Sequence, residues 1–274
     1  MSDRTALITG CSSGIGRATA ESFADSEWVV YATARDTDDI ADLAERGCET
    51  AQLDVTNDED VAAVIERIDD HTGRVDCLVN NAGFGQYGPL EDVPVGRLHR
   101  QFDVNVYGPH RLTRAVLPLM RLREDGTIIN VSSVYGRLSM PGTGPYSASK
   151  FALEAMSDAL RAEVDDLGID VVVIEPGIVE TDFQGRMGAE IDGLSHSDSY
   201  EWLYEMLDDA ITTAGSLPFA IESEEVATAI HDVACLSDPN PRYPVGTMAK
   251  VLVYTEFLPD RLRDRIYRVM RRVA

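Results

Sequence analysis

Short apolar runs alternate with longer amphipathic stretches through the first two thirds of this 274-residue chain. Runs rich in Val and Ile that are separated by helix-length spacers are typical of a parallel sheet with helices on both faces. No repeat or low-complexity linker interrupts the alternation, so we expect one doubly wound α/β domain over residues 1–274. The strands are expected at residues 5–9, 28–33, 50–53, 77–79, 127–131 and 171–174, and the helices at 14–25, 37–46, 57–70, 94–122 and 146–167.

The alternation weakens after residue 178. Segment 183–217 mixes Gly, Ser and Asp with Met, Tyr and Trp, which indicates a small helical lid over a substrate pocket. Another helix is expected at 222–236 and a short last strand at 243–245. The tail, residues 258–274, is rich in arginine and is predicted to be a helix. Its apolar stripe consists of Leu258, Leu262, Ile266, Val269 and Val273.

The formal net charge of −23 argues against a basic face that binds nucleic acid. The acidic residues are spread along the chain, and only two lysines occur. This composition resembles that of proteins from salt-accumulating halophiles, so we expect stability and activity to rise in molar salt. The basic tail could dock on this acidic body or on a second subunit, which we favour, or it could lie on an anionic membrane surface.

No run of about 18 apolar residues is present, and the N-terminus lacks the apolar core of a signal peptide. The spacing of Cys11, Cys48, Cys77 and Cys235 fits neither a metal site nor a disulfide framework. We therefore expect a cytoplasmic protein without a transmembrane segment or a metal, with free thiols. Cys48 and Cys77 are expected in or near buried strands.

A glycine-rich loop separates the first expected strand from the first expected helix, with the sequence Thr9-Gly10-Cys11-Ser12-Ser13-Gly14-Ile15-Gly16. Glycines allow a tight turn and a close approach of the backbone to a ligand. The N-terminus of the following helix offers unpaired N–H groups to a pyrophosphate. A dinucleotide is therefore the expected ligand.

The end of the second expected strand predicts which dinucleotide binds. An acidic side chain there would hold the ribose 2′-hydroxyl of NAD, whereas arginine accommodates the 2′-phosphate of NADP. This chain has Ala34 followed by Arg35, and Ser12 could also reach the phosphate, so NADP(H) is favoured over NAD(H). Asp54, after the third strand, could accept a hydrogen bond from the adenine amine.

Tyr146 and Lys150 are four residues apart on an expected helix and therefore share one face of it. A nearby ammonium favours the phenolate, which would give an acid/base catalyst near neutral pH. Because lysine is so rare here, we interpret Lys150 as retained for chemistry that the delocalised charge of arginine cannot copy.

Together with further motifs, these features resemble the short-chain dehydrogenase/reductase family over roughly residues 4–182. The glycine loop and Ala32-Thr33-Ala34-Arg35 are most similar to the branch that contains hydroxysteroid and retinol dehydrogenases. The other matching motifs, in family order, are Asn80-Asn81-Ala82-Gly83, Asn105, Ile129-Asn130-Val131-Ser132-Ser133, Tyr146-Ser147-Ala148-Ser149-Lys150, Pro176-Gly177 and Thr181.

The resemblance implies a Rossmann fold and four catalytic residues. Tyr146 would be the general acid in carbonyl reduction and the general base in alcohol oxidation. Lys150 would lower the pKa of Tyr146 and hold the nicotinamide ribose. Ser133 would bind the substrate oxygen, and Asn105 would position a water in a proton relay to Lys150. The residues expected to hold the dinucleotide are Gly10, Ser12, Ser13, Gly14, Ile15, Gly16, Arg35, Asp54, Val55, Asn81, Ala82, Gly83, Tyr146, Lys150, Pro176, Gly177, Ile178 and Thr181.

The segments expected around the substrate pocket are apolar and aromatic, which suggests a hydrophobic carbonyl or alcohol, although these side chains could equally pack the lid on the body. They are Tyr135, Leu138, Met140, Met187, Trp202, Tyr204 and Met206. We expect an NADP(H)-dependent carbonyl reductase or alcohol dehydrogenase. The resemblance implies a homodimer or homotetramer built on the helices that carry Asn105 and Tyr146. The alternatives are an NADP-binding sensor without turnover, 3-oxoacyl reductase-like activity, and an epimerase or dehydratase.

Overall fold

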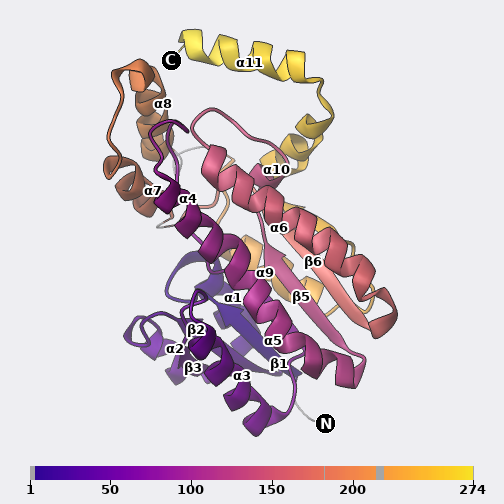
Figure 1. Ribbon diagram of the computed structural model, residues 1–274. Coiled ribbons are helices and arrows are strands. Elements are labelled where there is room, and N and C mark those ends of the chain that lie inside the picture. Colours follow the sequence, from indigo (N-terminus) through magenta and orange to yellow (C-terminus); the bar gives the residue numbers. More distant parts are fainter. Residues whose placement is uncertain (1–3, 182, 214–218, 274) are drawn as a thin grey trace.

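The computed structural model describes residues 4–181, 183–213 and 219–273. Its centre is a seven-stranded parallel sheet with the strand order β3-β2-β1-β4-β5-β6-β7 (Figure 1). The strands are β1 (Arg4–Thr9), β2 (Trp28–Ala34), β3 (Glu49–Gln52), β4 (Cys77–Asn80), β5 (Gly126–Val131), β6 (Ile169–Pro176) and β7 (Arg242–Val245). The expected α/β fold and all expected strands are confirmed, with ends that differ by a few residues.

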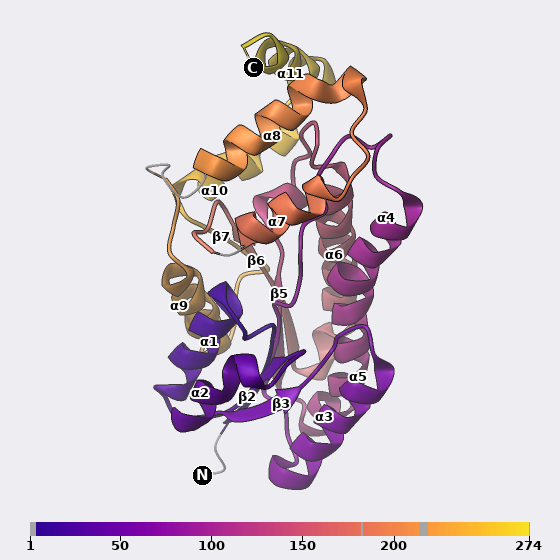
Figure 2. The same cartoon turned by 90° about the vertical axis from the view of Figure 1, so that its left-hand side faces the viewer.

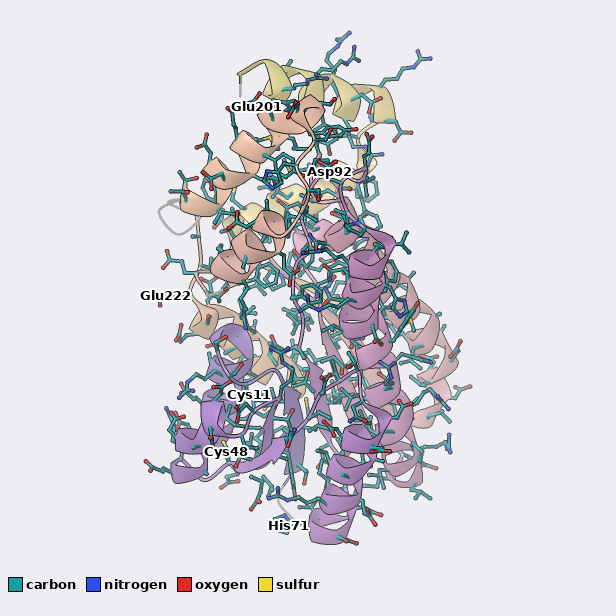
Figure 3. The ribbon with its side chains drawn as sticks, turned by 60° about the vertical axis from the view of Figure 1, so that its left-hand side comes forward. Cys11, Cys48, His71, Asp92, Glu201 and Glu222 are labelled. Carbon is teal, nitrogen blue, oxygen red and sulfur yellow. The ribbon has the colours of Figure 1, made fainter. Side chains whose placement is uncertain are left out.

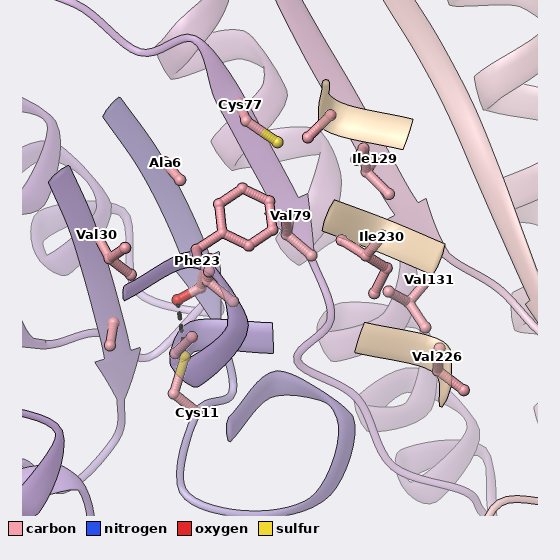
Figure 4. Packing of buried hydrophobic residues seen from close by; sticks show 14 of the residues in the cluster. Ala6, Cys11, Phe23, Val30, Cys77, Val79, Ile129, Val131, Val226 and Ile230 are labelled. Atoms are coloured by element: carbon pink, nitrogen blue, oxygen red, sulfur yellow. Dashed lines mark hydrogen bonds between the residues drawn. The ribbon is translucent and has the colours of Figure 1, made fainter. Parts of the chain in front are cut away.

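Helices cover both faces of the sheet (Figure 2). One face carries α1 (Gly14–Ala24), α2 (Ala41–Glu45) and α9 (Ser223–Ala234), and the other carries α3 (Asp58–Thr72), α5 (Gly108–Arg123) and α6 (Gly144–Glu163). The inner strands are buried because helices cover both faces, and their side chains alternate between the two resulting cores. On β1, Ala6 and Ile8 join one hydrophobic core, and Leu7 joins the other. Figure 4 shows Phe23 of α1 and Ile230 of α9 packed against Val79 and Ile129 in the first core.

Three expected helices are interrupted. The stretch expected at 37–46 forms a single turn, η1 (Asp38–Ile40), before the short α2, and the stretch at 146–167 ends at Glu163 with a separate turn, η4 (Asp165–Leu167). The stretch at 94–122 forms α4 (Val95–Phe102), a π-helical turn η2 (Asp103–Tyr107) and then α5. Pro109 lacks an N–H and cannot donate to the carbonyl of Asn105, which explains a change of hydrogen-bond pattern at this point.

Within the C-terminal third, α9 and β7 belong to the body, and the lid and the tail form a second tier above the carboxyl edge of the sheet (Figures 1 and 2). The expected lid consists of α7 (Phe183–Asp192), the turn η5 (Asp198–Tyr200) and α8 (Glu201–Thr213), while residues 182 and 214–218 lie outside the described part. After β7 come α10 (Thr247–Leu252), the turn η7 (Val253–Phe257) and α11 (Asp260–Val273), so the tail is helical as expected. None of the helices in the described residues is long and apolar enough to cross a bilayer.

The four cysteines are free thiols, as expected. Cys77 opens β4, Cys48 lies buried just before β3, and Cys235 is exposed after α9. Cys11 lies buried in the glycine loop, where its thiol donates to the carbonyl of Ile8 at 3.3 Å (Figure 4). Burial raises the pKa of the Cys11 thiol to about 12, so Cys11 packs the loop rather than reacting.

Candidate active site

The glycine loop crosses the carboxyl edge of the sheet between β1 and β4, where the strand order reverses. In doubly wound sheets, ligands bind at this position. Gly10 and Gly14 have φ values of +73° and +56°, which only glycine adopts without strain. A Cβ on Gly10 would lie 2.9 Å from Cα of Ala82, and a Cβ on Gly14 would lie 2.9 Å from Cγ2 of Thr181. The loop therefore needs glycine for both conformation and space.

Asn81 holds the loop in place. Its side-chain nitrogen donates to the carbonyls of Thr9 at 2.9 Å and Gly10 at 3.3 Å. The backbone N–H groups of Asn81 and Ala82 both donate to the hydroxyl of Thr9 at 3.0 Å. The structure thus gives Asn81 and Ala82 a supporting role in shaping the loop, in addition to the cofactor contact expected of them.

The first turn of α1 is open to an anion. Ser13 is its N-cap residue, but the Ser13 side chain accepts no hydrogen bond from the free N–H groups of the turn. Arg186 of α7 donates to the hydroxyl of Ser13 at 3.2 Å, which places a guanidinium at this helix end. An open hollow of about 460 Å³ begins beside Gly14 and Thr181. Sequence reasoning missed Arg186, because its distance from Ser13 along the chain hides the contact.

The adenosine end of the expected cofactor site lies beyond β2 and β3. Arg35 is exposed directly after β2 and forms no ion pair with any described residue, so its charge is available. Asp54 is half-buried, and its carboxylate accepts from the N–H and hydroxyl of Thr56 at 2.9 and 2.7 Å. Val55 is buried against Gly108, so its side chain belongs to the core.

The carboxyl end of β5 meets the first turns of α6, and this junction brings together Tyr146, Lys150 and Ser133. Tyr146 and Lys150 lie one turn apart on α6, and both are buried. Nζ of Lys150 donates to the carbonyl of Val131 at 2.8 Å and lies 5.7 Å from the centre of the Tyr146 ring. Ser133 follows β5 directly, and its hydroxyl lies near enough to the Tyr146 phenol to lower the pKa of that phenol. The structure therefore brings these three residues together, and their catalytic roles stay predictions.

The pKa values of the pair are shifted mainly by burial. Burial lowers the pKa of Lys150 to about 8, and the charge of Glu154 opposes this shift. Burial also raises the pKa of Tyr146 above its ordinary value, while the nearby Ser133 hydroxyl acts in the opposite direction. The expected lowering of the Tyr146 pKa is therefore wrong for this structure, because removal of water from the phenolate outweighs its neighbours. A neutral phenol is the acid form that a reduction requires.

Asn105 lies in the π-helical turn and is buried. Its side-chain oxygen accepts from the N–H of Phe84 at 3.1 Å, and its nitrogen donates to the carbonyl of Phe84 at 2.9 Å and to Ser149 at 3.2 Å. Asn105 thus connects the loop after β4 to Ser149, the residue directly before Lys150. The proton relay implied by the family resemblance remains a prediction.

The lid, together with Tyr87 and Tyr135 of the body, places an apolar, aromatic surface on Tyr146. The ring of Tyr87 stacks on Tyr146 with centres 5.4 Å apart, and the rings of Phe183 and Tyr135 lie 5.7 and 6.0 Å from it. Of the residues expected around the pocket, five belong to this cluster: Tyr135, Met187, Trp202, Tyr204 and Met206. Leu138 and Met140 pack instead with Val134 and Ala249. Tyr87 and Phe183 were missed, since neither stands in a recognisable motif.

Polar contacts fasten the lid to the loop before α4. Tyr204 donates to Asp92 at 2.7 Å, and Tyr200 donates to Glu91 at 2.7 Å (Asp92 is labelled in Figure 3). Arg97 of α4 pairs with Glu190 of α7 at 3.1 Å and donates to the carbonyl of Gly193 at 2.7 Å. These contacts hold α7 and α8 over Tyr146.

The residues present fit a dinucleotide. The glycine cradle, the open helix end with Arg186 and the available Arg35 form one path along the sheet edge towards Tyr146 and Lys150. Pro176 ends β6, and the half-buried Gly177, Ile178 and Thr181 follow it. Among the described side chains, no group of three potential metal ligands is found.

Comparisons with known proteins agree with this site. The sequence model for short chain dehydrogenases matches residues 4–192. The chain is 34% identical over 277 residues to an NADPH-dependent 3-dehydrocapnine reductase of Ornithobacterium rhinotracheale, covering 96% of both proteins. It is 40% identical over 198 residues to human retinol dehydrogenase 8, covering 69% of this chain and 63% of that protein. A short-chain dehydrogenase structure from Streptomyces avermitilis superimposes with a TM-score of 0.81 at 34% identity, covering 97% of this chain and 95% of that one. This protein therefore belongs to the short-chain dehydrogenase/reductase family and is an NAD(P)-dependent oxidoreductase.

Proposed function

We propose that this protein interconverts a carbonyl and an alcohol on an apolar substrate with NADP(H), and that Tyr146 is its general acid and base. The observation that carries this proposal is the buried Tyr146 phenol, which lies beside Ser133 and one helical turn from Lys150. A phenol and a serine hydroxyl that point at one position can stabilise the negative charge that develops on a carbonyl oxygen during reduction.

The chain's own residues orient the substrate and move one proton. The bound nicotinamide supplies the hydride. Ser133 donates a hydrogen bond to the substrate oxygen, and Tyr146 transfers its proton to that oxygen as negative charge develops. The Lys150 ammonium stabilises the phenolate that remains. In alcohol oxidation, the same phenolate accepts the proton back.

NADP(H) is the proposed cofactor because of charge at the end of β2. Arg35 is exposed there without an ion pair among the described residues, and Ala34 replaces the acidic residue that would favour a free 2′-hydroxyl. The similarity to an NADPH-dependent reductase supports this choice.

The proposed substrate is apolar because aromatic and aliphatic side chains surround Tyr146. Tyr87, Phe183, Met187 and Leu203 contribute to this surface. The similarity to retinol dehydrogenase 8, which is named for an apolar alcohol, supports the same class of substrate.

We also propose a cytoplasmic homo-oligomer that is adapted to molar salt. The free thiols are consistent with a reducing compartment. The net charge of −23 with only two lysines supports the salt adaptation, since salt screens the self-repulsion of such a surface.

The test is an NADPH absorbance assay in molar salt with a panel of ketones and aldehydes of increasing apolar size. We expect oxidation of NADPH that is faster with large apolar carbonyls, and markedly slower turnover with NADH. Arg35→Ala should raise KM for NADPH while leaving KM for NADH nearly unchanged. NADPH binding without turnover over the whole panel would favour a sensor, and product formation without net NADPH oxidation would favour an epimerase or dehydratase.

A further inference from the structure

The helix α11 carries an unusual concentration of positive charge. Residues 258–274 contain six arginines and two aspartates, whereas the whole chain has a net charge of −23. In Figures 1 and 2, α11 lies at the far end of the molecule, beyond the lid helix α8. A basic helix at the extremity of an acidic protein calls for a physical explanation.

The contacts of α11 with the body use a polar row of side chains. Tyr267 donates to the carbonyl of Ser139 at 2.6 Å, and the guanidinium of Arg271 lies 5.0 Å from the centre of the Trp202 ring. Arg263, one turn before Tyr267, is half-buried on the same row. The docking of the tail on the body, which the sequence favoured, is therefore present, but the apolar stripe does not carry it.

The apolar stripe is turned away from the body. Leu262, Ile266 and Val269 are 43%, 42% and 54% exposed. At about 100° per residue, this stripe lies roughly 130° around the helix from the row that touches the body. A helix that only packs on its own domain buries its apolar stripe instead.

A row of arginines borders the exposed stripe. Arg261, Arg265 and Arg268 are exposed, and none of them forms an ion pair with a described residue. Around the helix axis, these arginines lie about 100° from the apolar stripe and about 130° from the row that touches the body. Figure 3 shows nitrogen-tipped side chains that extend from α11 away from the body. The preceding segment adds Tyr254 and Phe257, which are 69% and 75% exposed.

We propose that α11 docks this protein on the surface of a lipid bilayer with anionic headgroups. Helices that lie in a membrane interface combine an apolar stripe with flanking cations, which bind the headgroups. Pairing with α11 of a second copy fits less well. If the apolar stripes of two α11 helices packed on each other, their arginine rows would also come close together. Asp260 and Asp264 lie nearer the row that faces the body, so they could not neutralise these arginines. In molar salt, screening over about 3 Å weakens both the repulsion between the acidic body and the bilayer and the attraction of the arginines to the headgroups, so the apolar stripe then carries most of the binding.

The test is co-sedimentation of the full chain with vesicles of phosphatidylcholine alone or mixed with phosphatidylglycerol. We expect binding to the mixed vesicles and weak binding to phosphatidylcholine. Changing Arg261, Arg265 and Arg268 to Gln should weaken binding to mixed vesicles roughly 100-fold at moderate salt, since each cation near an anionic surface contributes about fivefold. Changing Leu262, Ile266 and Val269 to Ser should weaken binding to both vesicle types at any salt.

Leu122→Ser is the matched control, because Leu122 is 83% exposed on α5, far along the chain from the tail. It should bind vesicles like wild type. Circular dichroism and oligomer mass are measured for every variant. Equal sedimentation with and without vesicles would overturn the proposal. So would an oligomer that dissociates when the stripe is changed to Ser, because a second copy of the chain would then be the partner.

Discussion

Lys150→Met should make this protein more stable at neutral pH while disabling its site. Burial lowers the pKa of Lys150 from 10.5 to about 8, a shift of about 2.5 units. At 1.36 kcal/mol per unit, keeping this ammonium in the folded protein costs about 3 kcal/mol. Methionine removes that cost, but it also removes the hydrogen bond to the carbonyl of Val131, which contributes about 1 kcal/mol. The variant should gain about 2 kcal/mol in free energy of unfolding at pH 7.

The pH dependence of this gain follows from the direction of the shift. Below pH 8, Lys150 is protonated in both states, and the folded protein carries the full cost. Between pH 8 and 10.5, the folded lysine is neutral while the unfolded chain still binds a proton, so the free energy of unfolding of wild type rises with pH. The advantage of Lys150→Met over wild type should therefore shrink by about 3 kcal/mol between pH 7 and 10.5.

The measurement is urea unfolding of both proteins in molar salt across this pH range. Comparing the two proteins cancels the titration of other groups. Lys250→Met, at the exposed second lysine, is the control and should stay within about 0.5 kcal/mol of wild type. A difference between Lys150→Met and wild type that does not change with pH would refute the claim that a buried ammonium is strained here.

Three further predictions concern the site and the surface. Ser133→Ala should lower kcat about 100-fold with little change in the affinity for NADPH, because it removes one donor to the reacting oxygen. Arg186→Ala should raise KM for NADPH several-fold with kcat nearly unchanged, since the Arg186 guanidinium lies at Ser13 beside the open helix end. The control is Arg114→Ala, at an exposed position on α5, which should change neither KM nor kcat. Melting temperature and activity should rise together from dilute buffer to molar salt, and full activity in dilute buffer would contradict the halophilic interpretation.

Local patterns predicted much of this fold. The apolar runs marked the strands, because strands buried on both faces contain few polar residues. The glycine loop and the spacing of Ser133, Tyr146 and Lys150 predicted that these residues gather at one edge of the sheet, since the carboxyl ends of parallel strands meet there. Each of these signals depends on residues that are close in sequence or on a recognised family order.

The rest depends on packing over long distances. The contacts of Tyr87 and Phe183 with Tyr146, and of Arg186 with Ser13, join segments whose meeting depends on the path of the lid. The direction of the Tyr146 pKa shift was predicted wrongly because the sequence showed the nearby lysine but not the extent of burial. The outward orientation of the α11 stripe likewise follows from contacts of Tyr267 that no periodicity reveals.

The most direct test of the proposed catalysis is Tyr146→Phe, compared with wild type in NADPH turnover and NADPH binding. The ring stays in its aromatic cluster, so the fold and the cofactor affinity should be nearly unchanged. Loss of the general acid should lower kcat by roughly 10²–10⁴-fold. A variant that binds NADPH normally and keeps near-normal kcat would show that Tyr146 does not supply the proton, and the account of the site would be wrong.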